Sequence, residues 1–318
     1  MKEMVTFGGI SAAPGEKKQG WAPVLDTDYK LPVTVINGAG EGKTVLITAG
    51  IHGCEYPSLQ AGFELAEELD PAQLNGQVVI ICPVNVDAFI DRVPYVLPQD
   101  GKNINRLFPG NPEGTLGDKI AYVLPHEYQM RADFYIDIHG GDIPEALPPY
   151  VYNPGIGEDK ECLMLAEQAA LHVLSAQYRL KSSATSGAYN SCAILGVPSI
   201  LIERGGCGVW SNEEKDIYKK DIINVMKFLK VYPGEAQLPE TPAKLITRGE
   251  YLDATVSGRW YPAVALGDQV KKGQKLGEIK DLFGNVLAEY CAEYDATVLM
   301  LTVSLAVKKG YAIITYGC

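Results

Sequence analysis

The feature that most constrains the fold is an alternation of short apolar runs with longer stretches of helical spacing. The first apolar run, residues 45–48, leads into residues 57–69, whose apolar side chains recur every three or four positions. Such runs are typical of buried strands, and such spacing is typical of amphipathic helices. Three further strands are predicted at residues 77–83, 134–138 and 199–202, and three further helices at residues 115–130, 158–174 and 212–229. The order predicts an α/β fold with a mostly parallel or mixed sheet flanked by helices.

Polar side chains gather where these predicted strands end. His52 and Glu55 follow the first strand, in a loop that Gly50 and Gly53 allow to turn sharply. His139 and Glu203 each follow a later strand. Parallel strands place their carboxyl ends at one edge of a sheet, so these side chains are expected to converge. An imidazole and a carboxylate three residues apart can reach one zinc ion together, but the pair alone is a weak signal that needs a third ligand and a base.

The composition excludes several classes of protein. The 318 residues are 47% hydrophobic and 21% charged, which is ordinary for a soluble protein. A net charge of −11 disfavours nucleic acid or an anionic membrane as the main partner. The seven cysteines are scattered without a C-x-x-C pair, which indicates a reducing compartment. The N-terminus lacks the apolar core of a signal peptide, and no run is long enough to span a membrane, so we expect a cytoplasmic protein.

Two loops matter for the function. Residues 38–44 are rich in glycine, but only three residues separate Gly38 from Gly42, and the segment precedes a strand instead of joining a strand to a helix. We therefore reject a phosphate-binding loop and expect a glycine-rich hairpin. Residues 85–112 are predicted to be irregular, and a loop this long inside a compact α/β domain is usually functional.

The sequence pattern changes near residues 234–244, which are rich in Pro, Glu and Ala and are predicted to be a linker. After this linker, short alternating β-like runs replace the helical spacing. We expect a catalytic domain at residues 1–236 and a small all-β domain at residues 245–318. In the second domain, residues 270–279 recur as residues 307–316, with V-K-K-G at the start of both copies. This repeat resembles the biotinyl/lipoyl barrel-sandwich domains. Phe283 stands about where those domains carry the modified Lys, so we interpret the domain as unmodified.

Taken together, these motifs resemble the zinc carboxypeptidase superfamily, and more closely its succinylglutamate desuccinylase/aspartoacylase branch. The resemblance rests on His52-x-x-Glu55, on the run D-G-K-N-I-N-R-L-F-P-G at residues 100–110, and on His139 and Glu203 in that order. It covers about residues 40–318, because that branch also carries a C-terminal β domain.

The resemblance implies one catalytic zinc per chain, held by His52, Glu55 and His139, with Glu203 as general base. Three N or O ligands leave a fourth zinc position open for water, whose pKa zinc lowers to ~7. A neighbouring carboxylate can take the proton and return it to a leaving amine. The sequence therefore predicts a zinc-dependent amidohydrolase, a deacylase that cleaves an amide or ester bond.

Three arginines are candidates for binding substrate. Arg106 can grip a carboxylate with two parallel hydrogen bonds, and Asn105 can add a third. The resembled family places an Arg shortly before the D-G-x-N-x-N-R run, where it polarises the scissile carbonyl. Here Arg92 is farther away, with an extra residue between. Either Arg92 or Arg204 takes this role, or the oxyanion relies mainly on zinc.

Each of these residues also has a purely structural interpretation. His139 alone would be a satisfied buried histidine, Glu203 would pair with Arg204, and Arg106 would brace its own loop. Their joint occurrence in this order favours the zinc site.

The expected substrate is a small molecule with a free carboxylate, such as an N-acyl amino acid. In an acidic protein a local Arg must supply the recognition of an anion, and a β domain packed over the mouth of the site would exclude long peptides. A zinc carboxypeptidase acting on peptides and a non-catalytic metal- or ligand-binding protein are the alternatives. Association with further copies of the chain is left open.

Overall fold

The centre of the molecule is a group of four parallel strands. A computed structural model describes residues 2–318. The four strands lie side by side in the order β6 (Asn75–Ile81), β5 (Gly40–Ala49), β7 (Phe134–Ile138) and β10 (Ser199–Gly206). Their apolar runs are buried on both faces, as expected of parallel strands between helices. The predicted strands are therefore confirmed.

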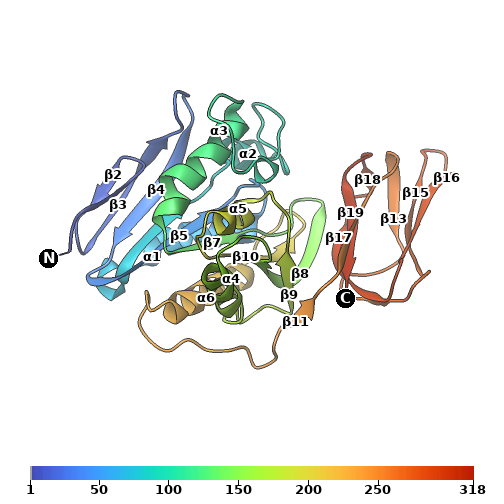
Figure 1. Ribbon diagram of the computed structural model, residues 1–318. Coiled ribbons are helices and arrows are strands. Elements are labelled where there is room, and N and C mark those ends of the chain that lie inside the picture. Colours follow the sequence, from blue (N-terminus) through green and yellow to red (C-terminus); the bar gives the residue numbers. More distant parts are fainter. Residues whose placement is uncertain (1) are drawn as a thin grey trace.

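Antiparallel strands extend this centre on both sides, so the sheet is mixed (Figure 1). Beyond β6 lie β4 (Lys30–Asn37) and β3 (Glu16–Pro23). Because β6 lies between β4 and β5, the glycine-rich connection at residues 38–44 does not form the expected hairpin. Its last residues belong to β5 itself, which begins at Gly40.

Helices cover both faces of the sheet, as predicted. On one face α1 (Tyr56–Glu68), α4 (Lys160–Ala170) and α6 (Asn212–Phe228) share one hydrophobic cluster with the strands. On the other face α3 (Leu116–Val123) and α5 (Ala188–Ile194) contribute to a second cluster. The predicted helix at residues 115–130 passes after α3 into a π-helical turn that contains Pro125, which lacks the N–H that a regular helix requires. Further short elements are α2 (Val86–Asp91), β1 (Val5–Phe7), β2 (Ile10–Ala12), β9 (Tyr178–Ser182) and three 3-10 helices, η1 (Pro71–Gln73), η2 (Ile104–Arg106) and η4 (Gln129–Arg131).

One strand was not predicted. The Pro-rich stretch expected to be a loop is β8 (Glu145–Pro154), which pairs antiparallel with β10. The register shifts so that Pro148 and Pro149 both lie opposite the single residue Arg204. Prolines cannot donate to a ladder of hydrogen bonds, and this bulge removes the need for them to do so.

The C-terminal part is all β and has its own hydrophobic cluster around the buried Trp260. Its strands are β11 (Lys244–Ile246), β12 (Gly249–Asp253), β13 (Gly258–Pro262), β14 (Gln269–Val270), β15 (Lys275–Lys280), β16 (Val286–Cys291), β17 (Ala296–Thr302), β18 (Ala306–Val307) and β19 (Ala312–Gly317). The internal repeat is confirmed, because β14–β15 and β18–β19 are both a two-residue strand, a turn and a six-residue strand. Gly273 and Gly310 occupy equivalent turn positions, with φ of +82° and +85°.

The two parts are joined by more than the chain that connects them. Residues 229–243 contain neither helix nor strand, and the C-terminal part stands to one side in Figure 1. However, Leu301 and Thr302 of β17 pair with the first two residues of β8, so the large sheet continues from one part into the other. The division into domains at residues 1–236 and 245–318 stays a prediction. Within residues 2–318, none of the helices has the length and apolar character needed to cross a membrane.

Candidate metal centre and its surroundings

His52 and Glu55 lie in the loop that joins β5 to α1, at the carboxyl end of the central strand. Gly50 has a φ of +71°, and a Cβ at Gly53 would lie 2.3 Å from the backbone nitrogen of Phe89. Glycine is therefore required at both positions to let the loop turn and to let α2 approach. Glu55 is the residue that precedes the first turn of α1, so its carboxylate lies at the positive end of that helix.

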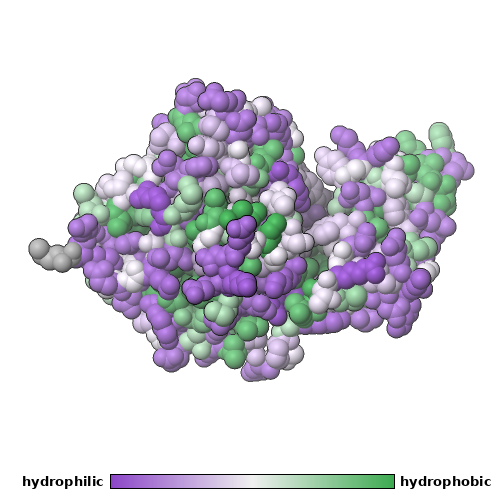
Figure 2. All heavy atoms as spheres, viewed as in Figure 1, coloured by the Kyte–Doolittle hydropathy of each residue, from purple (hydrophilic) through white to green (hydrophobic). Residues whose placement is uncertain are grey.

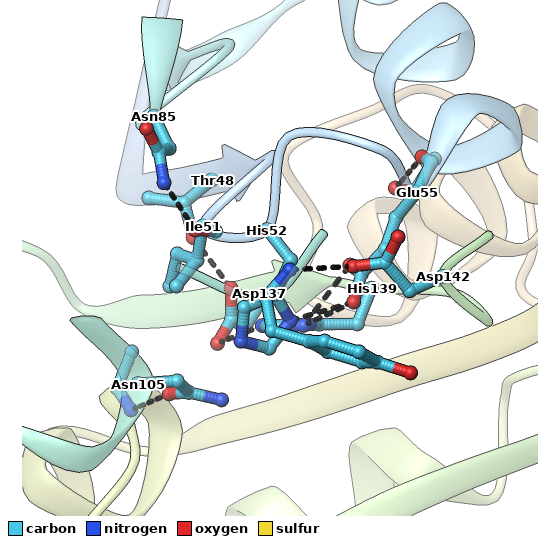
Figure 3. Close-up of polar contacts among 12 residues, drawn as sticks. Thr48, Ile51, His52, Glu55, Asn85, Asn105, Asp137, His139 and Asp142 are labelled. Carbon is cyan, nitrogen blue, oxygen red and sulfur yellow. Dashed lines mark hydrogen bonds and ion pairs between the residues drawn. The ribbon is translucent and has the colours of Figure 1, made fainter. Parts of the chain in front are cut away.

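His139 follows β7 directly and completes a buried group with His52 and Glu55, which we call the His/Glu/His cluster (Figure 3). His52 Nδ1 lies 2.7 Å from Glu55 Oε1, and His139 Nδ1 lies 3.1 Å from Glu55 Oε2. One ligand atom from each residue falls within 4.8 Å of the others. The fold therefore brings these three side chains together, as the sequence predicted.

The chemistry of these donors fits a cation. Burial alone would raise the pKa of Glu55, but the charges of His139 and His52 outweigh burial and lower this pKa to about 2. Although buried, Glu55 Oε2 makes no hydrogen bond of good geometry within residues 2–318. Buried carboxylate oxygens normally have partners, so this oxygen has capacity left for a metal ion.

Two residues that were not predicted hold the far side of the imidazole rings. Asn103 Oδ1 lies 3.0 Å from His52 Nε2, and Asp137 Oδ2 lies 3.2 Å from His139 Nε2. In both rings Nε2 lies next to an oxygen acceptor, so Nδ1 faces Glu55. In metal-binding histidines, a second group of this kind fixes the tautomer and the orientation of the ring. The signal for Asp137 was present in the sequence, because residues two apart on a strand share a face.

A buried chain of hydroxyl groups supports Asp137 in turn. Thr48 Oγ1 donates to Asp137 Oδ1 over 2.7 Å, and the Tyr135 hydroxyl lies 2.5 Å from the same Thr48 oxygen. All three side chains are buried. The carboxylate of Asp137 is therefore fixed from both ends, which fixes the ring of His139.

Glu203 lies on β10 beside this cluster. His139 donates its backbone N–H to the carbonyl of Ile202 over 2.9 Å, so Glu203 lies one residue beyond the point where the strands meet. Burial raises the pKa of Glu203 to about 7, and the charge of His139 only partly opposes this shift. Its side chain forms no ion pair with the residues that the structure describes.

A purely structural role for Glu203 would require an ion pair with Arg204, and the two residues do not form one. Its guanidinium donates instead to Glu214 of α6, with Nε–Oε2 and Nη2–Oε1 distances of 2.6 and 3.2 Å. Successive residues of a strand point to opposite faces, so Glu203 and Arg204 diverge. With its fork already bound by a carboxylate, Arg204 is poorly suited to stabilise an oxyanion.

Two more carboxyl groups near the cluster were missed from the sequence. Asp142 is buried and accepts the N–H of Tyr95 over 2.8 Å, and Glu145 begins β8. Burial raises the pKa of Asp142 to about 6 and that of Glu145 to about 7. The cluster is therefore surrounded by carboxyl groups that are easier to protonate than exposed ones.

Of the other candidate residues for binding substrate, two arginines lie at the surface and one asparagine is buried. Arg92 and Arg106 are exposed, and neither forms an ion pair among residues 2–318. Among residues 2–318, the guanidinium of Arg106 makes one hydrogen bond, a long one of 3.5 Å to the carbonyl of Asn105. Asn105 is buried, and its Oδ1 accepts the N–H of Ala188 over 2.9 Å, which leaves its amide NH₂ as the free donor.

The C-terminal part contributes tyrosines to the same region. The hydroxyls of Tyr251 on β12 and Tyr152 on β8 lie 2.8 Å apart. Glu203 and Arg106 both act electrostatically on the hydroxyl of Tyr251, so this tyrosine lies near both. The ring of Tyr311 meets that of Tyr95 edge to face at 6.2 Å, and Tyr95 meets His52 in turn at 6.3 Å. These contacts place the C-terminal part beside the His/Glu/His cluster, and Figure 2 shows a notch between the two parts.

Comparison with known proteins gives a consistent result. Residues 41–229 match the family of succinylglutamate desuccinylase/aspartoacylase catalytic domains. N-alpha-acetyl-L-2,4-diaminobutyric acid deacetylase of Halomonas elongata is 27% identical over 312 residues, which cover 96% of this chain and 89% of that protein.

Solved structures resemble almost the whole chain. The product-bound ectoine utilization protein EutE (DoeB) of Ruegeria pomeroyi has a TM-score of 0.83 and 28% identity, with 95% of both chains covered. A succinylglutamate desuccinylase/aspartoacylase from Rhodobacter sphaeroides has a TM-score of 0.82 and 26% identity, and covers 95% of this chain and 94% of its own. The likeness extends through the C-terminal β part as well as the catalytic part.

Proposed function

Because the chain belongs to the succinylglutamate desuccinylase/aspartoacylase family, we propose that it is a zinc-dependent deacylase of small N-acyl amino acids. One observation carries the proposal. His52, Glu55 and His139 meet at the carboxyl edge of the sheet, and a carboxyl group with a raised pKa, Glu203, lies beside them. The groups that could bind a cation therefore lie next to a candidate general base.

The metal would be held by His52 Nδ1, the carboxylate of Glu55 and His139 Nδ1. The unsatisfied Oε2 of Glu55 and the oxygen acceptors behind both rings support this assignment. When bound, zinc supplies a Lewis acid that polarises the scissile carbonyl and lowers the pKa of water to ~7. Two imidazoles and one carboxylate are a ligand set that catalytic zinc sites use.

Glu203 is proposed as the general base. A carboxylate with a pKa near 7 can accept a proton from water at neutral pH and release it again to the amine that leaves. The absence of an ion pair at Glu203 within residues 2–318 supports this role, because a paired carboxylate would be a weaker base. Positioned proton transfer of this kind contributes about 10²–10⁴-fold to the rate.

The substrate carboxylate is proposed to bind Arg106, with the free NH₂ of Asn105 as a second donor. Arg106 is unpaired, near Tyr251 and close to the acidic centre, where a lone cation would attract an anionic group. Arg92 at the end of α2 is proposed to polarise the carbonyl in preference to Arg204, because Arg204 already pairs with Glu214. The Halomonas elongata relative is named for removing an acetyl group from an amino acid, which supports a small acyl group here. All seven cysteines are free, which supports the proposed cytoplasmic location.

A hydrolysis screen tests the proposal. The zinc-loaded protein would be offered N-acetyl, N-succinyl and longer N-acyl amino acids beside short peptides. We expect cleavage of acyl amino acids and little cleavage of peptides. Arg106→Ala should lower kcat/KM by about 10–100-fold, because a charge-assisted pair is lost.

Arg248→Ala is the matched control, since it removes an exposed arginine that stacks on Tyr294 in the C-terminal part. Equal cleavage of peptides would favour a carboxypeptidase instead. Binding of these compounds without any hydrolysis would favour a non-catalytic binding protein.

A further inference from the structure

Strand β8 brings one aromatic residue face to face with the candidate base. Tyr150 of β8 lies directly opposite Glu203 of β10 in the antiparallel ladder. Two residues that oppose each other in such a ladder point to the same side of the sheet, with Cβ atoms about 4.5–5.5 Å apart. The pairing of these strands therefore places a phenolic hydroxyl beside the carboxyl group of Glu203.

The bulge in β8 determines which residue takes this position. Gly205 lies opposite Leu147, and a regular ladder would continue with Pro149 opposite Glu203. The extra residue in β8 moves Tyr150 into that position instead. Because a slip of one residue turns every side chain to the other face, the bulge selects a hydroxyl donor over a proline as the neighbour of the carboxyl group. Bulges beside active sites often re-aim a side chain in this way.

The hydroxyl of Tyr150 lies within hydrogen-bonding reach of the Glu203 carboxyl group. Burial, together with the charge of Glu203, raises the pKa of Tyr150 well above its ordinary value, so the hydroxyl keeps its proton and is available as a donor. Burial raises the pKa of Glu203 to about 7, while the charge of His139 and the hydrogen bond from Tyr150 act in the opposite direction. A donor to a carboxylate favours its charged form, which is the form that a base needs.

Other titratable groups face Glu203 from every element that packs against it. They are Glu55 and His52 of the β5–α1 loop, His139 after β7, Glu145 and Tyr152 of β8, Tyr189 of α5, Tyr218 of α6 and Tyr251 of β12. The two histidines form their ion pairs with Glu55 and Asp137. These charges act on Glu203 from a distance and do not fix its orientation.

The hydroxyls of the other four tyrosines are engaged elsewhere. Those of Tyr152 and Tyr251 lie 2.8 Å from each other. The hydroxyl of Tyr218 donates to the backbone at the end of β7, and that of Tyr189 reaches a serine of β9. Among the tyrosines around Glu203 in residues 2–318, Tyr150 is thus the one placed to donate to its carboxylate.

Both parts of the molecule hold the ring of Tyr150. The ring is buried and meets that of Tyr152 edge to face at 5.4 Å. Tyr150 also belongs to a hydrophobic cluster that contains Ile246, Leu299 and Met300 of the C-terminal part. A side chain locked by packing in this way can hold a functional group in one geometry.

We propose that Tyr150 is a positioning residue, whose hydroxyl donates to the carboxylate of Glu203, turns it toward the His/Glu/His cluster and favours its charged form. The inference rests on the proposed function, in which Glu203 is the general base. Tyr150 acts through Glu203, so no bond to its hydroxyl oxygen forms or breaks in the reaction. Through the packing of Tyr150, the C-terminal part contributes to the placement of the base.

The test compares Tyr150→Phe with the wild type as zinc-loaded, full-length proteins, on the N-acyl amino acid that the hydrolysis screen selects. Loss of a donor to the charged form raises the pKa of the base, so the acid limb of the kcat/KM profile should move up by about 1–2 pH units. At pH 7 kcat should fall ~10-fold with KM unchanged, and the deficit should shrink as the pH rises. A merely structural role would lower activity equally at every pH.

Tyr290→Phe is the matched control. It removes a buried hydroxyl that accepts the N–H of Thr255 over 2.8 Å in the core of the C-terminal part. This variant should keep the pH profile of the wild type. Phenylalanine keeps the ring in both cases, and thermal midpoints would show that both variants are folded.

A second readout does not depend on catalysis. The infrared band of the protonated Glu203 carboxyl group, identified by its loss in Glu203→Gln, would be followed against pH without substrate. Its midpoint should lie at higher pH in Tyr150→Phe than in the wild type, and should not move in Tyr290→Phe. If Glu203→Gln loses activity but Tyr150→Phe shifts neither the midpoint nor the acid limb, the inference is overturned and the base remains. If Glu203→Gln keeps full activity, the proposed base and the inference both fail.

Discussion

Proteins usually bury apolar side chains and expose polar ones. The carboxyl edge of the central sheet and the β15–β16 hairpin both depart from this distribution. At the sheet edge, carboxyl groups and imidazoles are buried around His139, whereas at the hairpin Phe283 and Leu282 are exposed. Both arrangements cost stability in the isolated chain. The buried polar groups are compensated by hydrogen bonds and ion pairs with one another. The apolar side chains at the hairpin tip remain exposed. The first region therefore offers ligand atoms for a cation, whereas the second offers only an apolar surface.

The strongest test of the buried region is Glu203→Gln. This change keeps the size of the side chain but removes the base, so we expect kcat to fall about 10²–10⁴-fold. Zinc content by elemental analysis and the thermal midpoint should stay as in the wild type. Full activity in the variant would show that Glu203 is merely one of the buried carboxyl groups around the cluster.

A smaller effect is expected from Asp137→Asn, which keeps the shape of the side chain behind His139 but not its charge. Groups that orient metal-binding histidines typically contribute about 10–100-fold to metal affinity. Competition with a zinc chelator would measure the change. Asp133→Asn is the control, because this carboxylate near the start of the same strand accepts the N–H of Thr44 over 2.7 Å and is remote from the cluster. An equal loss in both variants would mean that the effect comes from general destabilisation of the strand.

The contribution of the C-terminal part to the site can be tested with Tyr251→Phe. The variant loses one hydrogen bond to Tyr152, so the free energy of unfolding should fall by about 0.5–1.5 kcal/mol. KM should rise ~2–10-fold, because the Tyr152 hydroxyl is no longer held in place by the C-terminal part. Tyr261→Phe removes a hydroxyl from the outer face of the same part and should have no effect. If the two variants have the same KM, the β part is only a neighbour of the site.

The smallest expected effect concerns a surface carboxylate that contrasts with Glu203. Burial would raise the pKa of Glu64, but hydrogen bonds from Lys215 and Lys219, both 2.7 Å long, outweigh it and lower this pKa to about 2. The stabilisation is therefore present above pH 4.5, the ordinary value, and is lost as the pH falls toward 2. Glu64→Gln should lower the free energy of unfolding at pH 7 by about 1 kcal/mol, which is the upper end of the range for ion pairs near the surface.

Chemical denaturation at several pH values would check this prediction. The difference between Glu64→Gln and the wild type should shrink toward zero at the acid end of the range. Glu67→Gln, an exposed neighbour on α1, is the control and should show no such trend. A difference that is constant with pH would contradict the proposed origin of the stabilisation.

Much of the catalytic part could be predicted because its signals are local. The apolar runs of β5, β7 and β10 and the helical spacing of α1 and α6 are properties of neighbouring residues. The convergence of His52, Glu55 and His139 followed from one topological rule, that parallel strands end at the same edge. The internal repeat similarly gave the β character of residues after 245.

The predictions that failed depended on contacts between distant residues. Pro148 and Pro149 argued against a strand, and only the bulge opposite Arg204 makes β8 possible. The hairpin expected at residues 38–44 is absent because β6, which comes later in the chain, inserts between β4 and β5. The role of Arg204 stays a prediction, and its pairing with Glu214 of α6 is likewise a contact between separate elements. No local pattern encodes these partners.

The seam between β8 and β17 has a consequence for biosynthesis. Strand β8 begins at residue 145 and the β17 residues that pair with it are Leu301 and Thr302, so about half the chain is translated between them. Until β17 leaves the ribosome, that end of β8 has an uncovered edge, which is a template for pairing with another chain. Misassembly of nascent chains should therefore be most frequent in this interval, after the catalytic residues have been made and before the sheet that contains them is finished.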